Sequence, residues 1–143
     1  MKKLMTIGCL AALCMGAASC ASTKNVATLS SLNGEWNIIE INGEVVVPAP
    51  GQTFPFIAFN AETGEVYGNA GCNIVNASII HDEANPSSLK FHSLIRTMMT
   101  CPDMEVEDRV INSLNATVSF GALADGAVGF YDAENNLVLV IKK

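Results

Sequence analysis

The chain has 143 residues, with 14 acidic and 8 basic side chains and a formal net charge of −6. This acidic balance lacks the basic patch that holds phosphate backbones, so it excludes nucleic acid as an expected partner. The length allows one domain with a hydrophobic core.

The first residues have the pattern of an export signal. Lys2 and Lys3 precede the uncharged stretch Leu4 to Ser19, which is shorter than the ~20 apolar residues of a membrane-spanning helix. Small residues then stand before Cys20. The sequence therefore predicts a signal peptide over residues 1–19. Cleavage there also removes both lysines and leaves a mature chain with a formal charge of −8.

Cys20 has two interpretations. The opening resembles a bacterial lipoprotein signal, in which this Cys is acylated and becomes the first mature residue. Ala17 stands where such signals usually have Leu, and an ordinary signal peptidase would leave Cys20 as a bare thiol. Two or more acyl chains would hold the protein on a membrane. We expect an exported, membrane-anchored envelope lipoprotein on the periplasmic or surface side, whose membrane contact comes from the N-terminal anchor.

Residues 20–31 are small and polar, and we expect them to carry the lipidated Cys and form a tether. The folded domain is expected over residues 32–143. In its first strand, alternation places Trp36, Ile38 and Glu40 on one face, and Asn37, Ile39 and Ile41 on the other. Asn42-Gly43 then predicts a tight hairpin with positive φ angles.

The remaining elements are short strands and one helix. Strands are expected at 54–59, 65–67, 74–80, 89–91, 127–131 and 137–141, with a polar loop at 81–88. Pro102 suits the first helical position, and the acids at 103, 105 and 107 suit the positive helix end. Val106, Val110, Ile111 and Leu114 give this helix an apolar stripe. The expected fold class is α+β, mostly β: an antiparallel β-barrel or half-barrel of about eight short strands with one covering helix.

Four segments occur in an informative order: Leu-Asn-Gly-Glu-Trp at 32–36, Ile-Asn-Gly at 41–43, Gly-Asn-Ala-Gly-Cys-Asn at 68–73 and Thr-Met-Met-Thr-Cys at 97–101. Together they resemble the META domain, the family of the HslJ-like heat-shock lipoproteins, over residues 30–143. The motif positions are Gly34, Trp36, Asn42, Gly43, Gly71, Cys72, Asn73, Thr97, Met99 and Cys101. The resemblance implies a small β-rich α+β domain of exported or envelope proteins. It also implies a role in heat stress, antibiotic tolerance or motility, a fold like that of lipid-binding secretin pilotins, and no established enzymatic activity.

Cys72 and Cys101 remain in the folded body. Two thiols in an exported protein invite a disulfide, which would close a loop of about 30 residues and stabilise the fold by about 3–4 kcal/mol. Two buried free thiols are the first alternative. A reactive thiol at Cys101, at the helix start, is the second.

Met98, Met99 and Met104 cluster around Cys101. Flexible Met side chains suit an apolar pocket for a lipid or hydrophobic peptide between helix and sheet. Filling of the ordinary core is the alternative.

No metal or cofactor site is expected. His81-Asp82-Glu83 with His92 is the one group with metal-ligand chemistry, but adjacent residues of an extended chain point in opposite directions, so both imidazoles should face solvent. Glu105, Glu107 and Asp108 are explained by the helix dipole and a wet helix face. The Gly68–Gly71 segment predicts a sharp bend that turns Cys72 and Asn73 inward rather than a phosphate loop.

Two hypotheses for function follow. The first is a non-catalytic envelope lipoprotein that binds an envelope protein or a hydrophobic ligand and supports stress tolerance. The second is a small envelope hydrolase or thiol redox protein, which requires convergent titratable groups in a cleft.

Overall fold

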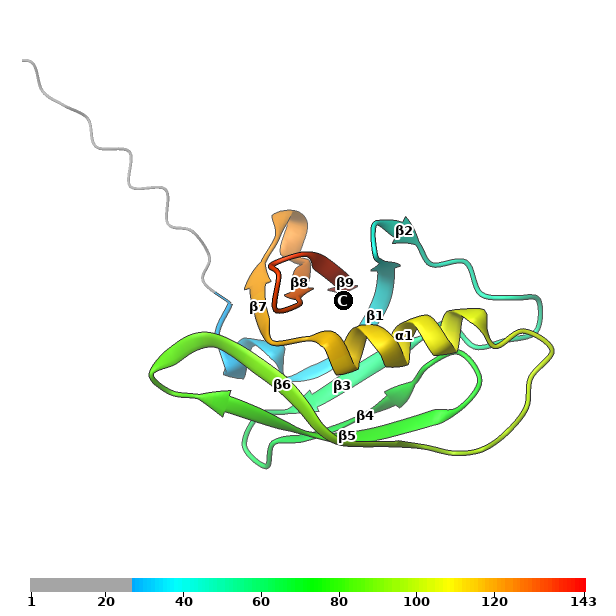
Figure 1. Cartoon of the computed structure of the whole chain (residues 1–143), viewed down its shortest axis with the longest axis horizontal. Helices are drawn as coiled ribbons and strands as arrows, with labels where there is room; N and C mark the ends of the chain where they lie inside the picture. Colours follow the sequence, from blue (N-terminus) through cyan, green and yellow to red (C-terminus); the bar gives the residue numbers. More distant parts are fainter. Residues whose placement is uncertain (1–26) are drawn as a thin grey trace, which may run out of the picture.

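A computed structural model describes residues 27–143 (Figure 1). Within this range the chain forms nine strands, one α-helix and two short 3-10 helices. In chain order they are η1 (Leu29–Leu32), β1 (Gly34–Ile41), β2 (Glu44–Val45), β3 (Phe56–Asn60), β4 (Glu65–Asn69), β5 (Ile74–Asp82), β6 (Asn85–Arg96), α1 (Glu105–Ala116), β7 (Ser119–Ala122), η2 (Ala124–Gly126), β8 (Val128–Tyr131) and β9 (Leu137–Lys142).

The strands form one antiparallel sheet that closes into a ring. The order is β2-β1-β3-β4-β5-β6-β7-β8-β9, and β1 pairs with β9 as well as with β2 and β3. Closure removes most of the unpaired strand edges that an open sheet would leave. The predicted α+β, mostly β class with a barrel-like antiparallel sheet is confirmed.

Helix α1 covers the part of the ring where two neighbouring strands, β6 and β7, pair least. Strands β6 and β7 share the single register pair Ser88–Ser119, so most of β6 runs free of β7. Helix α1 packs against β6, β9 and β1, and Figure 1 shows it lying between β6 and the β7–β9 strands. Arg109 ties the helix to the first hairpin by donating to the Ile41 carbonyl and contacting Glu44, each at 2.8 Å. The covering helix is therefore confirmed.

Three phenylalanines from distant strands pack together, with Phe59 and Phe130 buried in the core and Phe91 partly buried against them. Phe59, Phe91 and Phe130 lie on β3, β6 and β8, with ring centroids 5.9–6.2 Å apart and inclined planes. Tilted and edge-to-face contacts at this spacing add to the hydrophobic gain of burial. The core thus joins both halves of the ring.

The folded body begins before the expected start at residue 32. Leu32 is fully buried at the end of η1, and its carbonyl accepts a hydrogen bond from Trp36 Nε1 at 2.6 Å. Ala27 and Leu29 also pack against the core. The expected signal peptide at 1–19, Cys20 and the tether up to residue 26 lie outside the described residues.

The predicted alternation in β1 is wrong after Ile38. A register shift between Ile38 and Glu40 marks a β-bulge. The extra residue turns the strand, so Ile41 is buried with Trp36 and Ile38, whereas Glu40 is partly exposed. The Asn42-Gly43 hairpin is confirmed, with φ angles of 50° and 82°.

Three other element predictions need correction. The polar loop expected at 81–88 is mostly strand, because Asp82 pairs with Asn85 and leaves a two-residue turn. Helix α1 begins at Glu105 rather than Pro102. Asp103 holds the chain outside the helix there, since its carboxylate accepts from the Glu105 amide at 2.9 Å and its carbonyl accepts from Gln52 at 2.6 Å. The short strand β7 was not predicted.

Candidate functional site

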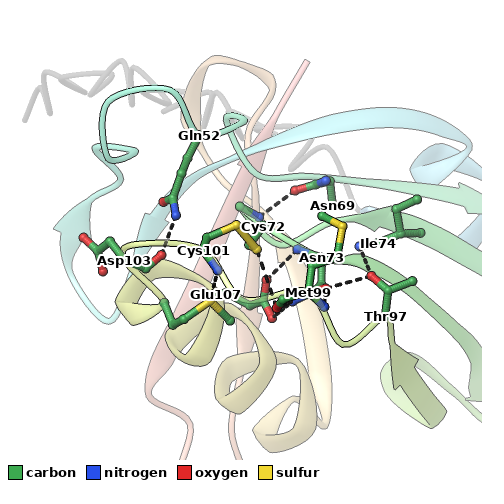
Figure 2. The surroundings of a disulfide bond; sticks show 12 residues. Gln52, Asn69, Cys72, Asn73, Ile74, Thr97, Met99, Cys101, Asp103 and Glu107 are labelled. Carbon is green, nitrogen blue, oxygen red and sulfur yellow. Dashed lines mark hydrogen bonds between the residues drawn. A yellow bond between two sulfur atoms is a disulfide. The ribbon is translucent and has the colours of Figure 1, made fainter.

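The two cysteines of the folded body form a disulfide, with their Cα atoms 6.1 Å apart (Figure 2). It joins the turn after β4 to the segment before α1, 29 residues along the chain. Cys72 is buried and Cys101 half-buried. The expected pairing is confirmed, and the alternatives of two free thiols or a reactive Cys101 thiol are wrong for this state of the protein.

Asn73 fastens the segment that follows β6. Its Oδ1 accepts from the Met99 amide at 2.7 Å and from Thr97 Oγ1 at 2.8 Å, and its Nδ2 donates to the Met99 carbonyl at 3.0 Å. The side chain is 1% exposed, so these bonds replace hydration that the amide has lost. One asparagine therefore fixes the course of a neighbouring loop.

The other side of Asn73 meets a buried carboxylate. Glu107 accepts from the Asn73 backbone N–H at 2.6 Å, from Asn73 Nδ2 at 2.8 Å and from Arg96 Nη1 at 2.9 Å. Glu107 is 1% exposed, whereas the Arg96 side chain is 33% exposed and also contacts Asp108 at 3.2 Å. Both carboxylate oxygens are occupied, which suits a structural tie more than a proton-transfer group.

The wet-face prediction for Glu107 is therefore wrong, while Glu105 and Asp108 are exposed as expected. Residues three and four apart are neighbours on a helix, so position 107 lies on the same face as the apolar positions 110, 111 and 114. The spacing alone therefore places Glu107 on the buried face. Its partners could not be read from this spacing, because Asn73 lies 34 residues away.

The bend at residues 68–71 is confirmed. Gly71 has a φ of 122°, a conformation that L side chains rarely adopt. Its N–H donates to Asn69 Oδ1 at 2.7 Å, and the Ala70 N–H donates to the Asn73 carbonyl at 3.0 Å. The turn aims Cys72 and Asn73 inward.

The methionines do not fill the core. Met98 is 88% and Met99 59% exposed, while Met104 is half-buried just before α1 and accepts from the Cys101 amide at 3.4 Å. They line a shallow hollow of about 170 Å³ together with Asn73, Arg96, Thr97 and Thr100. The three side chains lie together at the surface rather than between helix and sheet.

The barrel interior is filled. The void between the helix stripe and the inner face of β3–β6 measures about 10 Å³, no more than one water probe. Pockets that bind drug-sized ligands measure roughly 300–1,000 Å³. A lipid or other ligand has no space there in this conformation.

The two histidines lie on β5 and β6 rather than in the loop at residues 97–104. His92 is exposed, as expected, but His81 is half-buried, with Nδ1 2.7 Å from the Ser88 carbonyl across the β5–β6 hairpin. Across residues 27–143, no three His, Cys, Asp or Glu side chains form a group that could hold a metal ion. In the same range, no helix combines the length and apolarity needed to span a bilayer.

A family model of the META domain matches residues 27–143. The chain belongs to the META-domain family. Five of the ten motif residues lie on one structural device: Thr97 and Met99 bind Asn73, and Cys101 is bonded to Cys72. We call these five residues the loop anchor.

Two solved structures are similar in fold to this META domain. A protein from Burkholderia xenovorans, solved by NMR, is 17% identical, with a TM-score of 0.61, and the match covers 99% of this chain and 97% of that one. A DUF4847-family protein from Bacteroides vulgatus ATCC 8482 is 14% identical, with a TM-score of 0.52, and the match covers 77% and 92%. Among curated proteins, nothing matches. At these identities the likeness concerns the fold alone.

Proposed function

We propose that this META-domain protein is an exported, lipid-anchored binding module of the bacterial envelope, without catalytic activity, that supports stress tolerance by holding an apolar protein surface. The observation that carries the proposal is the exposure of Met98 and Met99 on a loop fixed by the loop anchor. Because the loop is already ordered, a partner would gain apolar contact without a large entropic cost of ordering it.

Neighbouring side chains enlarge this surface. Ile74 is 52% and Ile95 65% exposed at the ends of β5 and β6. Thr97 places Ile74 beside the loop, since its amide donates to the Ile74 carbonyl and its hydroxyl accepts from the Ile74 amide, each at 3.1 Å. Ile95 lies two residues before Thr97 on β6. We call Ile74, Ile95, Met98 and Met99 the methionine patch. Grouped exposed apolar side chains of this kind mark interaction sites on soluble domains.

A protein surface fits this patch better than a small hydrophobic ligand. The hollow of about 170 Å³ at the methionines is below the usual ligand-pocket size. Met side chains adapt to different apolar shapes, which favours a flat contact. A hydrolase function finds less support because Glu107 is fully hydrogen-bonded. A thiol redox function finds less support because the bonded cysteines are 29 residues apart rather than in a CxxC pair.

The anchor and the patch need separate tests. For the anchor, cells fed a labelled fatty acid should label wild-type protein and not Cys20→Ser. Absence of label from both would contradict the lipid anchor.

For the patch, a photo-crosslinking amino acid at position 98 should give one discrete adduct in intact cells. The same group at Val45, 75% exposed on β2 and outside the methionine patch, is the matched control. The Met99→Glu change should abolish the adduct at 98. Equal adducts from both positions, or none from 98, would contradict the patch.

A further inference from the structure

A second hollow lies on the outer face of β3, β4 and β5. It measures about 540 Å³, within the range of small-molecule sites, whereas the barrel interior has almost no free space. Its polar lining comes from Asn60, Glu65, Tyr67 and Asn76. None of these residues belongs to the loop anchor or the methionine patch.

The strand register makes these side chains converge. Asn60 pairs with Glu65 across β3 and β4, and Tyr67 pairs with Asn76 across β4 and β5. Paired residues, and alternate residues of one strand, point to the same side of a sheet. The two amides, the carboxylate and the phenol therefore share one face. Phe56 contacts the Tyr67 ring edge-to-face, with centroids 6.3 Å apart, and so restricts its orientation.

These groups keep unused hydrogen-bonding capacity. Asn60 Oδ1 accepts from the amides of Glu62 and Thr63, which leaves the Asn60 Nδ2 donors free within the described part of the chain. Glu65 uses one oxygen to accept from Thr63 Oγ1 at 3.0 Å. The Tyr67 hydroxyl and the side-chain amide of Asn76 have no hydrogen-bond partner among residues 27–143, and Tyr67 is 54% exposed.

We infer that this hollow, which we call the Tyr67 site, binds a neutral carbohydrate such as one or two units of an oligosaccharide. A pyranose ring presents a face of C–H groups that packs on the electron-rich face of an aromatic ring. Its hydroxyls both donate and accept, which the amides of Asn60 and Asn76 match with donors and acceptors of their own. The Glu65 carboxylate adds an acceptor for a hydroxyl.

Charge and polarity narrow the ligand class. None of the lining residues is Lys or Arg, and Glu65 would repel a phosphate or carboxylate ligand. A purely apolar ligand would strip water from four polar side chains without replacing their hydrogen bonds. A neutral polyol with one apolar face satisfies both conditions.

The test is an NMR titration of the full chain, purified in a detergent without sugar groups, with cellotetraose and, separately, chitotetraose. At least one sugar should give saturable chemical-shift changes at the backbone amides of Tyr67 and Asn76. Tyr67→Ala should weaken binding about tenfold, the loss of one aromatic contact, while Tyr67→Phe should keep most of the affinity. Ile80→Ala, an exposed change on β5 outside the hollow, is the matched control and should leave binding unchanged.

Two results would overturn the Tyr67 site. The first is the absence of saturable shifts with both sugars in wild-type protein whose spectrum is that of a folded chain. The second is equal affinity in Tyr67→Ala and wild type. Met99→Glu should leave sugar binding intact, which separates this inference from the methionine patch.

Discussion

The two halves of helix α1 are held by different kinds of interaction. Its first turn is fixed by the hydrogen bonds of Glu107 and, just before it, by the disulfide at Cys101. The rest of the helix is fixed by Val110 and Leu114, which belong to the same buried apolar cluster as Phe130. Apolar burial supplies free energy without strict direction, whereas hydrogen bonds demand particular groups at particular positions. The core should therefore govern overall stability, and the polar end the position of the loop.

The largest loss of stability is expected from the apolar half. Phe130→Ala would leave a cavity beside Phe59 and Phe91 and lower the free energy of unfolding by about 3–5 kcal/mol. Phe54→Ala, at a 40% exposed position, is the matched control and should cost within about 1 kcal/mol. Urea denaturation measures both. Equal losses would contradict the central role of the phenylalanine cluster.

Removal of the disulfide should have a smaller and more local effect. The double variant Cys72→Ala with Cys101→Ala should lose about 3–4 kcal/mol, since the unfolded chain is no longer constrained. The lower global stability should speed exchange of the slowest core amides, and residues 97–104 should in addition exchange by local opening, because the bond no longer holds the loop. Unchanged local opening of residues 97–104 would contradict the role of the bond in fixing the loop.

Glu107→Gln tests the polar half directly. The NH₂ group of the new Gln would face the N–H donors of Asn73, and the contact with Arg96 would lose its charge. We therefore expect the free energy of unfolding to fall by about 2–3 kcal/mol. Ser113→Ala is the matched change on the same helix, since the Ser113 hydroxyl is buried and has no hydrogen-bond partner among the described residues. That variant should stay within about 1 kcal/mol of wild type or become more stable. A neutral Glu107→Gln would contradict the role given to the carboxylate.

The same contrast separates what the sequence predicts from what it does not. Periodicity and turn residues identify most strands, the helix and the Asn42-Gly43 hairpin, because they reflect local geometry. The expected export, together with two thiols in the folded body, predicts the pairing of Cys72 with Cys101. Helix spacing places Glu107 on the buried face, but its partners are not readable, because Asn73 and Arg96 belong to other elements.

Exposure of single apolar residues is equally hard to predict. Met98 suits a core by composition, but Asn73 holds the next residue, Met99, by its backbone and leaves both side chains outside. The bulge after Ile38 also escapes an alternation rule, since one extra residue reverses the faces of the strand. Register and loop course are tertiary properties.

The β8–β9 turn offers the smallest effect, and it sharpens the contrast between a buried and an exposed carboxylate. Asp132 accepts from Asn136 Nδ2 at 3.0 Å and from the backbone amides of Asn136 and Glu134 at 2.8 and 3.0 Å. The Asn136 side chain first, and then the backbone amides, lower the pKa of Asp132 below its ordinary value. The charged form is thus favoured by folding, so its contribution to stability is present above the unfolded pKa and lost as pH falls through the folded pKa.

Asn136→Ala should move the pKa of Asp132 back toward that of a free Asp in a carboxyl NMR titration. Because Asp132 lies in a surface turn where solvent screens its charge, stability at neutral pH should change far less than in Glu107→Gln. An unchanged pKa would mean that the Asn136 side chain does not hold the carboxylate in solution.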